Sequence, residues 1–419
     1  MSKNQIRSIK GTQDILPEES LKWRVLEEKI HSTMELFNYG QIRTPAFEKT
    51  ELFDRGVGLQ TDIVTKEMYS WIDQGGESLT LKPELTAPVS RAYIQHSLGT
   101  QKPLTKLYYI DALFRRERPQ KGRFRQFHQF GVEAFGSEHP EIDSEIISIA
   151  ITLFKELGLQ DISLKLNSIG SENCRESYKK DLKKFLKPHL SNLSESSQKR
   201  FESNPLRILD TKSPAELEII KNAPTISNFW TSEDKEHFDE LCKFLDALEI
   251  NYTIDSNLVR GLDYYSRTTF EIISPSLGAQ NAICGGGRYD KLVEMIGGKP
   301  TPGIGFASGI ERIMMALLDY PDSNSVDIYV AGIGPKVRQT VFTLTDDLRQ
   351  KKLSTECDLL RRSVKSQLRE ANKIGAKYAI IIGDKEFENK LVEVKNLENG
   401  SQEKIAIESV VDHMISLSF

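Results

Sequence analysis

Cysteine is scarce in this chain, and its spacing suits neither a disulfide framework nor a metal site. The 419 residues include four cysteines that lie far apart, with no Cys-x-x-Cys pair and no histidine at the spacing of a metal-binding motif. A disulfide-stabilised secreted scaffold and a zinc site are therefore not expected, and no protein side chain is expected to hold a metal. A reducing cytoplasm fits this composition best.

Long apolar runs and a large charge excess are also missing. No stretch of about 18 apolar residues could cross a membrane as a helix, and the polar N-terminal segment lacks the apolar region of a secretory signal. The net charge is −4, with 38% hydrophobic and 28% charged residues, a balance typical of a globular protein. Contact with nucleic acid therefore requires a local basic patch, because the chain as a whole is mildly acidic.

The length predicts two or three domains. Residues 1–170 mix helices with strands, and the predicted elements are a helix at Leu21–Phe37, strands at Tyr69–Ile72, Leu79–Leu81, Lys106–Leu113 and Arg125–Phe135, and a helix at Ile142–Leu157. Residues 171–250 are rich in lysine, glutamate and serine and follow helical periodicity, which predicts a helical insertion. Residues 251–320 resume the mixed pattern, so the insertion splits one domain into two parts.

The C-terminal part has a different order of elements. A polar linker is predicted at Asp319–Ser325. Residues 326–419 alternate strands with helices, which predicts a small, mainly parallel α/β domain. From Val326 onward, 15 Lys+Arg stand against 14 Asp+Glu, so this domain carries almost no net charge.

A strongly basic segment lies between two of the predicted strands. Arg115 to Arg125 contains six basic residues and one acidic residue, and Pro119–Gly122 is typical of a tight turn. A solvated run of charges is the simplest interpretation of such a segment. Phenylalanines interleave with the charges, however, and guanidinium forks suit contact with phosphate groups and RNA.

Four other motifs say little when each is taken alone. Leu258–Tyr265 has an arginine, an aspartate and two tyrosines, and a strand-edge turn with packed tyrosines is the alternative. Cys284–Asp290 has a glycine run that permits close approach to a ligand, but it lacks the Rossmann and P-loop spacings. In Gly303–Ile313 a glycine-rich strand leads into a helix with a cation between apolar neighbours, which favours a cleft. Leu81–Pro88 is uninformative by itself.

Together these motifs resemble the class II aminoacyl-tRNA synthetases, and in particular the histidine-specific family. The basic segment resembles motif 2 of this class, and Gly303–Arg312 resembles motif 3. Tyr39–Pro45, with the Phe47 and Glu48 that follow, resembles motif 1. Leu258–Tyr265, Gly286–Asp290 and Lys10–Asp14 are similar to segments of the histidine enzymes. Lys82 departs from the arginine that is common at its position, and no loss of activity is expected from this.

The resemblance implies an α+β fold and an ATP-dependent ligase. We expect an antiparallel catalytic sheet of six or seven strands with flanking helices, the helical insertion, and a C-terminal α/β anticodon-binding domain. The implied reaction joins L-histidine to tRNA(His) through a histidyl-adenylate and releases AMP and pyrophosphate. Mg²⁺ is expected to bridge the β- and γ-phosphates of ATP, and motif 1 to lie at the two-fold interface of a homodimer.

The resemblance also assigns roles to charged residues around ATP. Arg115 is expected at the α-phosphate and the histidine carboxylate. Arg260 is expected at the α-phosphate from the other side, where related enzymes use a magnesium ion. Arg312 is expected at the γ-phosphate, and Glu117 and Arg123 complete the ATP site. A guanidinium stays charged and can bind two oxygens at once, which suits these roles.

The histidine pocket is implied in the same way. Glu84, Thr86 and Gln129 are expected near the α-amino group, Glu133 and Tyr265 at the two imidazole nitrogens, and Leu85, Tyr264 and Tyr289 along the pocket. Neutral imidazole has one donor and one acceptor. An apolar competitor would leave both protein groups unpaired, so strong discrimination needs no editing. The chemistry needs no covalent nucleophile.

Contacts with tRNA are expected at two places. Gln120, Lys121 and Arg123 lie on the basic segment, and Arg361 and Arg362 lie in the C-terminal domain, where unstacked bases would be recognised; a solvated helix start is the alternative for the latter pair.

Two other functions compete with this interpretation. A non-catalytic relative that regulates a phosphoribosyltransferase would tend to lose the catalytic arginines and the anticodon domain. A synthetase for proline, threonine or glycine is disfavoured by Leu258–Tyr265.

Overall fold

The chain divides into two compact units, Met1–Tyr320 and Pro321–Phe419. The computed structural model describes residues 6–59, 61–120, 122–278, 281–317 and 326–417. The predicted linker at Asp319–Ser325 and the predicted contact residue Lys121 lie outside these ranges. Among the helices within them, none is long and apolar enough to cross a membrane.

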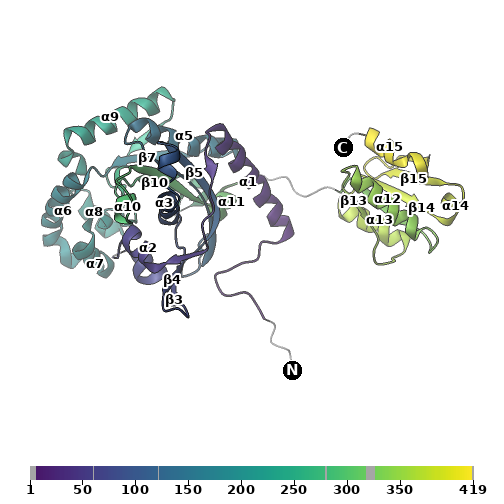
Figure 1. Cartoon of the computed structure of the whole chain (residues 1–419), viewed down its shortest axis with the longest axis horizontal. Helices are drawn as coiled ribbons and strands as arrows, with labels where there is room; N and C mark the ends of the chain where they lie inside the picture. The colour runs from purple at the N-terminus through teal and green to yellow at the C-terminus, as the bar shows by residue number, and fades with distance from the viewer. Residues whose placement is uncertain (1–5, 60, 121, 279–280, 318–325, 418–419) are drawn as a thin grey trace. The chain divides into compact units, whose positions relative to one another are not determined.

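The first unit is built on a sheet of eight described strands (Figure 1). Their order across the sheet is β1 (Gly40–Gln41), β5 (Thr105–Phe114), β6 (Gln126–Phe135), β11 (Gly303–Gly309), β10 (Ala282–Arg288), β9 (Ser266–Ile273), β7 (Ser163–Ser168) and β8 (Tyr252–Ile254). The six strands from β5 to β7 pair antiparallel, which confirms the prediction of an antiparallel sheet. The short edge strands β1 and β8 pair parallel with their neighbours, and they are too short to show a periodicity in the sequence.

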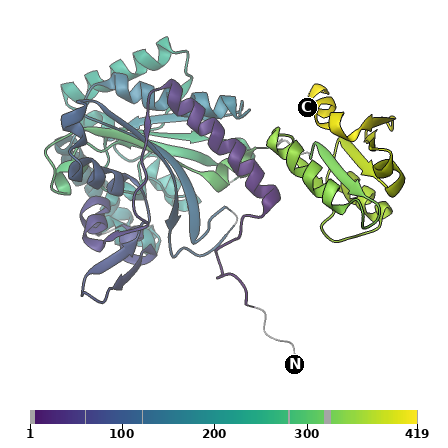
Figure 2. The same cartoon turned by 45° about the vertical axis from the view of Figure 1, so that its right-hand side comes forward.

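Alternation along β6 separates the two faces of this sheet. Phe130, Val132 and Ala134 are buried in a large apolar core. That core also takes the buried faces of α1 (Pro17–Leu36), α5 (Pro140–Glu156), α9 (Ser232–Ala247) and α11 (Ile310–Ala316), and Figure 2 shows α1 lying along the sheet. Gln129 and Glu133, which alternate with the core residues, therefore face the other side.

The other face of the sheet carries helices and a second, smaller sheet. The three-stranded sheet has the order β2 (Phe47–Lys49), β4 (Ser78–Leu81), β3 (Tyr69–Ile72). The short helices are α2 (Thr50–Phe53), α3 (Thr86–Gln95), α4 (Leu98–Gln101) and α10 (Leu292–Met295), and two π-helical turns lie at Asp54–Gly58 and Ile63–Glu67. Such turns often mark functional sites.

Between residues 171 and 250 every described element is helical, as predicted. The α-helices are α6 (Glu172–Leu186), α7 (Glu195–Ser203), α8 (Pro214–Ile220) and α9, joined by 3₁₀ turns. A capping box formed by Thr231 and Asp234 begins α9. Buried side chains of α6 share an apolar cluster with residues of α3 and of the segment 258–265, so these helices pack against the rest of the first unit through a common core.

The second unit is a five-stranded sheet with helices. The strand order is β13 (Thr355–Cys357), β12 (Ile328–Gly332), β14 (Tyr378–Ile382), β15 (Leu391–Asn396), β16 (Gln402–Ala406), and the helices are α12 (Arg338–Gln350), α13 (Val364–Lys373), α14 (Asp384–Glu388) and α15 (Val410–Ser416). Pairings of β12 are parallel, but β15 and β16 pair antiparallel. The prediction of a mainly parallel sheet was therefore wrong for the side formed by β15 and β16. The strand β16 was not predicted, because its exposed residues Gln402–Lys404 show no apolar alternation.

Candidate active site

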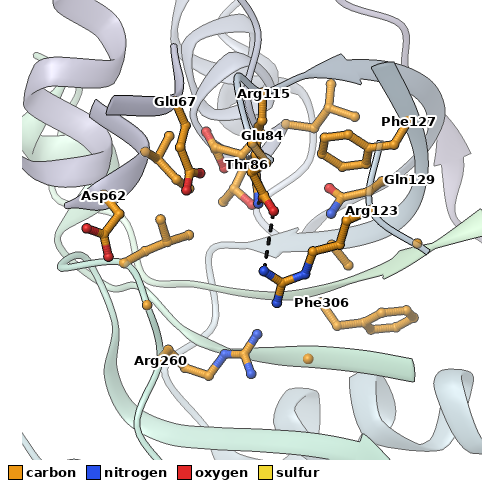
Figure 3. A pocket seen from close by; sticks show the side chains of 18 of the residues that line it. Asp62, Glu67, Glu84, Thr86, Arg115, Arg123, Phe127, Gln129, Arg260 and Phe306 are labelled. Atoms are coloured by element: carbon orange, nitrogen blue, oxygen red, sulfur yellow. Dashed lines mark hydrogen bonds and ion pairs between the residues drawn. The ribbon is translucent and has the colours of Figure 1, made fainter. Parts of the chain in front are cut away.

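A cavity of about 540 Å³ lies on the face of the main sheet that carries Gln129 (Figure 3). It brings together most of the predicted site residues, which are Glu84, Leu85, Thr86, Arg115, Glu117, Arg123, Gln129, Arg260, Tyr264, Tyr265, Tyr289 and Arg312. Glu133 joins this group through hydrogen bonds with three of the lining residues. Gln120 is on the basic segment but is not part of the lining.

Glu84 fixes the start of α3. Its two carboxylate oxygens accept the backbone N–H groups of Thr86 and Ala87, each at 2.9 Å. These N–H groups have no partner within the first turn of the helix. Burial raises the pKa of Glu84, and the two backbone hydrogen bonds oppose that shift. The result is a rigid helix start that points the Thr86 side chain toward the sheet.

Glu133 is the centre of a buried hydrogen-bond network. One carboxylate oxygen accepts the Thr86 hydroxyl at 2.7 Å and the Tyr109 hydroxyl at 3.2 Å, and the other accepts the Tyr289 hydroxyl. Burial raises the pKa of Glu133 to about 8, and the hydrogen bonds oppose this. A carboxylate offers roughly four acceptor positions, so the three hydroxyls leave space for one further donor.

Two glycines leave room for the charged groups of the site. A Cβ at Gly305 on β11 would collide with the Glu133 carboxylate, and a Cβ at Gly285 on β10 would collide with the Arg260 guanidinium. Only glycine permits such close approach to a strand. The glycine runs therefore belong to two central strands. Because these glycines have no side chains, the strand backbone forms the floor of the cavity.

Two arginines of the basic segment share one carboxylate. Arg115 donates through Nε to the carbonyl oxygen of Pro83 at 2.7 Å, and its guanidinium lies 5.2 Å from the centre of the Phe127 ring. Glu117 lies 3.8 Å from Arg115 Nη1 and 3.3 Å from Arg123 Nη1. Figure 3 shows Arg123 extending into the cavity. The hairpin between β5 and β6 thus delivers two oriented cations.

Arg260 approaches the cavity from the opposite side (Figure 3). Its Nη1 lies 3.2 Å from the Glu271 carboxylate, and its guanidinium lies 5.9 Å from the centre of the Tyr265 ring. Its Nε is buried without a hydrogen-bond partner among the described residues. A buried donor without a partner is rare in proteins and is consistent with a ligand that completes the site.

Arg312 is brought to the cavity by α11. The preceding Glu311 accepts the backbone N–H of His128 at 2.9 Å and contacts its ring Nδ1 at 3.0 Å, which ties α11 to β6. Burial lowers the pKa of Arg312, and the positive charge of Arg123 lowers it further. Cations therefore converge on one end of the cavity, where an anion would be stabilised.

Several lining residues were not predicted. Tyr109 lies opposite Gly131 in the β5–β6 pairing, and that glycine leaves room for its ring. Asp62 lies 3.1 Å from Arg207 and 3.6 Å from Arg200, two arginines of the insertion. The pairing of this tyrosine with a glycine depends on the register between two strands, which the sequence alone does not show. The three charged residues have no local pattern that separates them from solvated surface charges.

Cys284 is close to Arg260, but its surroundings do not favour a nucleophilic thiolate. Burial raises the pKa of its thiol, and a protonated thiol is a poor nucleophile. Within the described part of the chain, no cluster of three or more His, Cys, Asp or Glu side chains is arranged to hold a metal.

The predicted C-terminal contact residues have different surroundings. Arg362 is paired with Asp358 at 2.6 Å and with Glu370 at 3.1 Å. Arg361 is exposed, and both arginines line a cavity of about 480 Å³ in the second unit, together with Arg338 and Phe342.

An antiparallel sheet whose glycine-lined floor faces three converging arginines is the arrangement expected of a class II aminoacyl-tRNA synthetase. The family model described as histidyl-tRNA synthetase matches residues 11–313, and the one described as anticodon binding domain matches residues 327–417. The chain therefore belongs to the histidyl-tRNA synthetase family.

Similar proteins extend over almost the whole chain. It is 48% identical to the histidine–tRNA ligase of Acetivibrio thermocellus, over 97% of this chain and 98% of that protein. It is 47% identical to that of Caldanaerobacter subterraneus subsp. tengcongensis, over 96% and 97%. The crystal structure of apo S. aureus histidyl-tRNA synthetase matches with a TM-score of 0.83, at 37% identity, over 98% of this chain and 100% of that one.

Proposed function

We propose that this chain joins L-histidine to tRNA(His) with ATP, through a histidyl-adenylate. The observation that carries the proposal is the single cavity in which the Glu133 network lies beside Arg115, Arg260 and Arg312. Residues 1–170 and 251–320 would form the catalytic domain, residues 171–250 its insertion, and residues 326–419 the anticodon-binding domain. The match to the family over nearly the full length supports this.

In the first step, the histidine carboxylate attacks the α-phosphorus of ATP. A new O–P bond forms, the bond to the β-phosphate oxygen breaks, and pyrophosphate leaves. Arg115 holds the α-phosphate and the histidine carboxylate, Arg260 stabilises the α-phosphate from the other side, and Arg312 holds the γ-phosphate. Glu117 and Arg123 complete the ATP site, and Mg²⁺ would come with ATP as part of the substrate and would offset the negative charge of its phosphates. Positioning and charge, rather than proton transfer, supply most of the catalysis.

The histidine side chain is recognised through its two nitrogens. Glu133 accepts the imidazole N–H at its remaining acceptor position, and the Tyr265 hydroxyl serves the other nitrogen. The residues expected around the rest of the amino acid are Glu84, Thr86 and Gln129 at the amino group and Leu85, Tyr264 and Tyr289 along the pocket wall. Tyr264 and Tyr265 pack with ring centres 4.7 Å apart, which makes one rigid wall.

In the second step, a ribose hydroxyl at the 3′ end of tRNA attacks the adenylate carbonyl, and AMP leaves. Gln120, Lys121 and Arg123 would contact the RNA near the cavity. In the C-terminal unit we favour Arg361 over Arg362, because carboxylates already neutralise the Arg362 guanidinium. A guanidinium without such partners suits contact with phosphate or stacking on an unstacked base.

Amino-acid-dependent exchange of pyrophosphate into ATP tests this proposal. Among histidine, proline, threonine and glycine, only histidine should support exchange, because the other three offer no imidazole to Glu133 and Tyr265. Exchange supported by a different amino acid would refute the assigned specificity. A complete absence of exchange, with a correctly folded protein, would favour a regulatory relative instead.

We further propose a cytoplasmic homodimer with the motif 1 segment Tyr39–Pro45 at the two-fold interface. The strand β1 within this segment is the edge of the main sheet. Nearby on the small sheet, Phe47 and Trp71 stack edge to face with ring centres 5.9 Å apart, although both are largely exposed. Light scattering at micromolar concentration should therefore give twice the chain mass of 47.6 kDa. A fully active monomer would contradict the assembly.

A further inference from the structure

The segment 258–265, which carries three of the proposed site residues, is held from two sides. On the sheet side, Asn167 of β7 donates through Nδ2 to the carbonyl oxygen of Leu258 at 3.0 Å. At the other end, the helical insertion makes the contact, because Arg175 of α6 donates through Nη1 to the carbonyl oxygen of Tyr265. The position of this segment therefore depends on α6 of the helical insertion as well as on the main sheet.

The insertion also contacts the middle of the segment. Asn204, at the end of α7, donates through Nδ2 to the Asp263 carboxylate at 2.7 Å. The backbone N–H of Asp263 donates to the carbonyl oxygen of Val57 at 3.3 Å. Asp263 thus lies between the insertion and the π-helical turn at Asp54–Gly58.

The base of the insertion is tied to the strand that follows the segment. Asp234 at the start of α9 accepts the backbone N–H and the hydroxyl of Ser171, at 3.0 and 2.9 Å, and lies 3.6 Å from Arg267. Arg267 also exchanges backbone hydrogen bonds with Ile169 and Gly170, in front of α6. A displacement of α6 would therefore be transmitted to the segment rather than absorbed by a loose hinge.

The contacts between the insertion and the segment 258–265 act on side chains that the proposed reaction uses. Tyr265 is buried, its ring packs on Tyr264, and Arg260 lies over the same ring. A shift of the Tyr265 backbone would carry the tyrosine pair and the arginine with it. Misplacement by about 1 Å can cost a site about 10²-fold in rate.

We propose that Arg175 and Asn204 are positioning residues of the imidazole pocket, through which the helical insertion sets Tyr264, Tyr265 and Arg260 for histidine activation. The inference rests on the proposed histidine activation and goes beyond it. It gives the insertion a role in the step that needs no RNA.

The test is histidine-dependent pyrophosphate exchange without tRNA. Arg175→Met keeps an apolar stem of similar length and removes the donors. The KM for histidine should rise and kcat should fall, which together should lower kcat/KM for histidine about 10- to 100-fold, while the KM for ATP stays unchanged. Arg175→Lys should recover part of the loss, since an ammonium can donate one hydrogen bond to the carbonyl. Asn204→Ala should shift the KM for histidine in the same direction, by less.

Lys179→Met is the matched control. Lys179 lies one turn further along α6 and pairs with Glu176 at 3.0 Å on the outside of the helix, so its replacement should leave both KM values unchanged.

The outcomes separate this inference from the proposed function. If the unmodified enzyme shows no exchange with histidine, the proposed function fails and the inference falls with it. If the unmodified enzyme is active, an unchanged KM for histidine in both Arg175→Met and Asn204→Ala would overturn the inference alone. Equal losses for histidine and ATP, accompanied by a lower melting temperature, would overturn it too, because they indicate a purely structural role. Should Arg175→Met not fold, Asn204→Ala decides.

Discussion

Arg260→Ala should lower kcat for histidine-dependent pyrophosphate exchange by about 10²–10³, the usual effect of losing one preorganised electrostatic donor. The KM for histidine should rise by much less. The reason is that charge develops on the α-phosphate oxygens in the transition state, and Arg260 has a buried Nε without a partner among the described residues. Arg260→Lys should rescue only in part, because an ammonium cannot bind two oxygens in one plane.

A structural role is the alternative for Arg260, since it also pairs with Glu271 at 3.2 Å. In that case the alanine variant would melt at a lower temperature and lose exchange and transfer alike. Under our account, single-turnover transfer from preformed adenylate should suffer less than exchange, because the α-phosphate has already been attacked. Arg55→Ala is a suitable control, because Arg55 is more than half exposed and pairs with Glu51 on the surface. An unchanged exchange rate in Arg260→Ala would remove this residue from the mechanism.

Glu133→Gln should lower kcat/KM for histidine by about 10²-fold, because a hydrogen bond to a buried charged group is worth roughly 1.5–3 kcal/mol. The amide can still accept one N–H group, but its NH₂ would meet a site filled by hydroxyl donors. The KM for ATP should change little. Glu294→Gln provides the control, since Glu294 pairs with Lys291 at the surface, 3.1 Å away.

The pH dependence of the same variant identifies the working form of Glu133. Its pKa of about 8 refers to the free protein, and kcat/KM reports ionisations of the free enzyme. If the carboxylate accepts the imidazole N–H, the ratio of kcat/KM between the unmodified enzyme and Glu133→Gln should rise with pH through about 8. Ionisation of free histidine cancels in this ratio. A ratio that falls with pH would show that the protonated acid is the working form.

The same shift has a consequence for stability. The folded-state pKa of Glu133, about 8, exceeds the ordinary value of 4.5, so the folded chain binds more protons than the unfolded chain between these values. The contribution of Glu133 to stability therefore decreases as pH rises through this window. The melting temperature of Glu133→Gln should be less sensitive to pH across the same range.

Periodicity in the sequence was sufficient for the strands that carry the site. β6 begins one residue later than predicted, and β5 extends one residue beyond its prediction at each end. Away from the cavity, the strand at Tyr69–Ile72 matches its prediction. In β6, the core residues Phe130 and Val132 alternate with Gln129 and Glu133 on the opposite face. Edge strands such as β8 and β16 were missed because they are short or mostly exposed.

The candidate site was predictable only where residues stand in motifs. Arg115, Arg260 and Arg312 come from segments far apart in the chain, and their convergence depends on strand order, which no local pattern encodes. The contacts of Arg175 and Asn204 were not predicted for the same reason. Each is a single polar residue in a helical region rich in charges, and only the packing of α6 and α7 places it on the segment 258–265.

Charging of tRNA tests the central claim most directly. Purified tRNA(His) should accept labelled histidine in the presence of ATP and Mg²⁺, approaching one histidine per tRNA, and the bond should be labile to mild base as an ester is. A tRNA for another amino acid should stay uncharged. Exchange of pyrophosphate with histidine but no transfer to tRNA(His), in a protein with both units folded, would contradict the account.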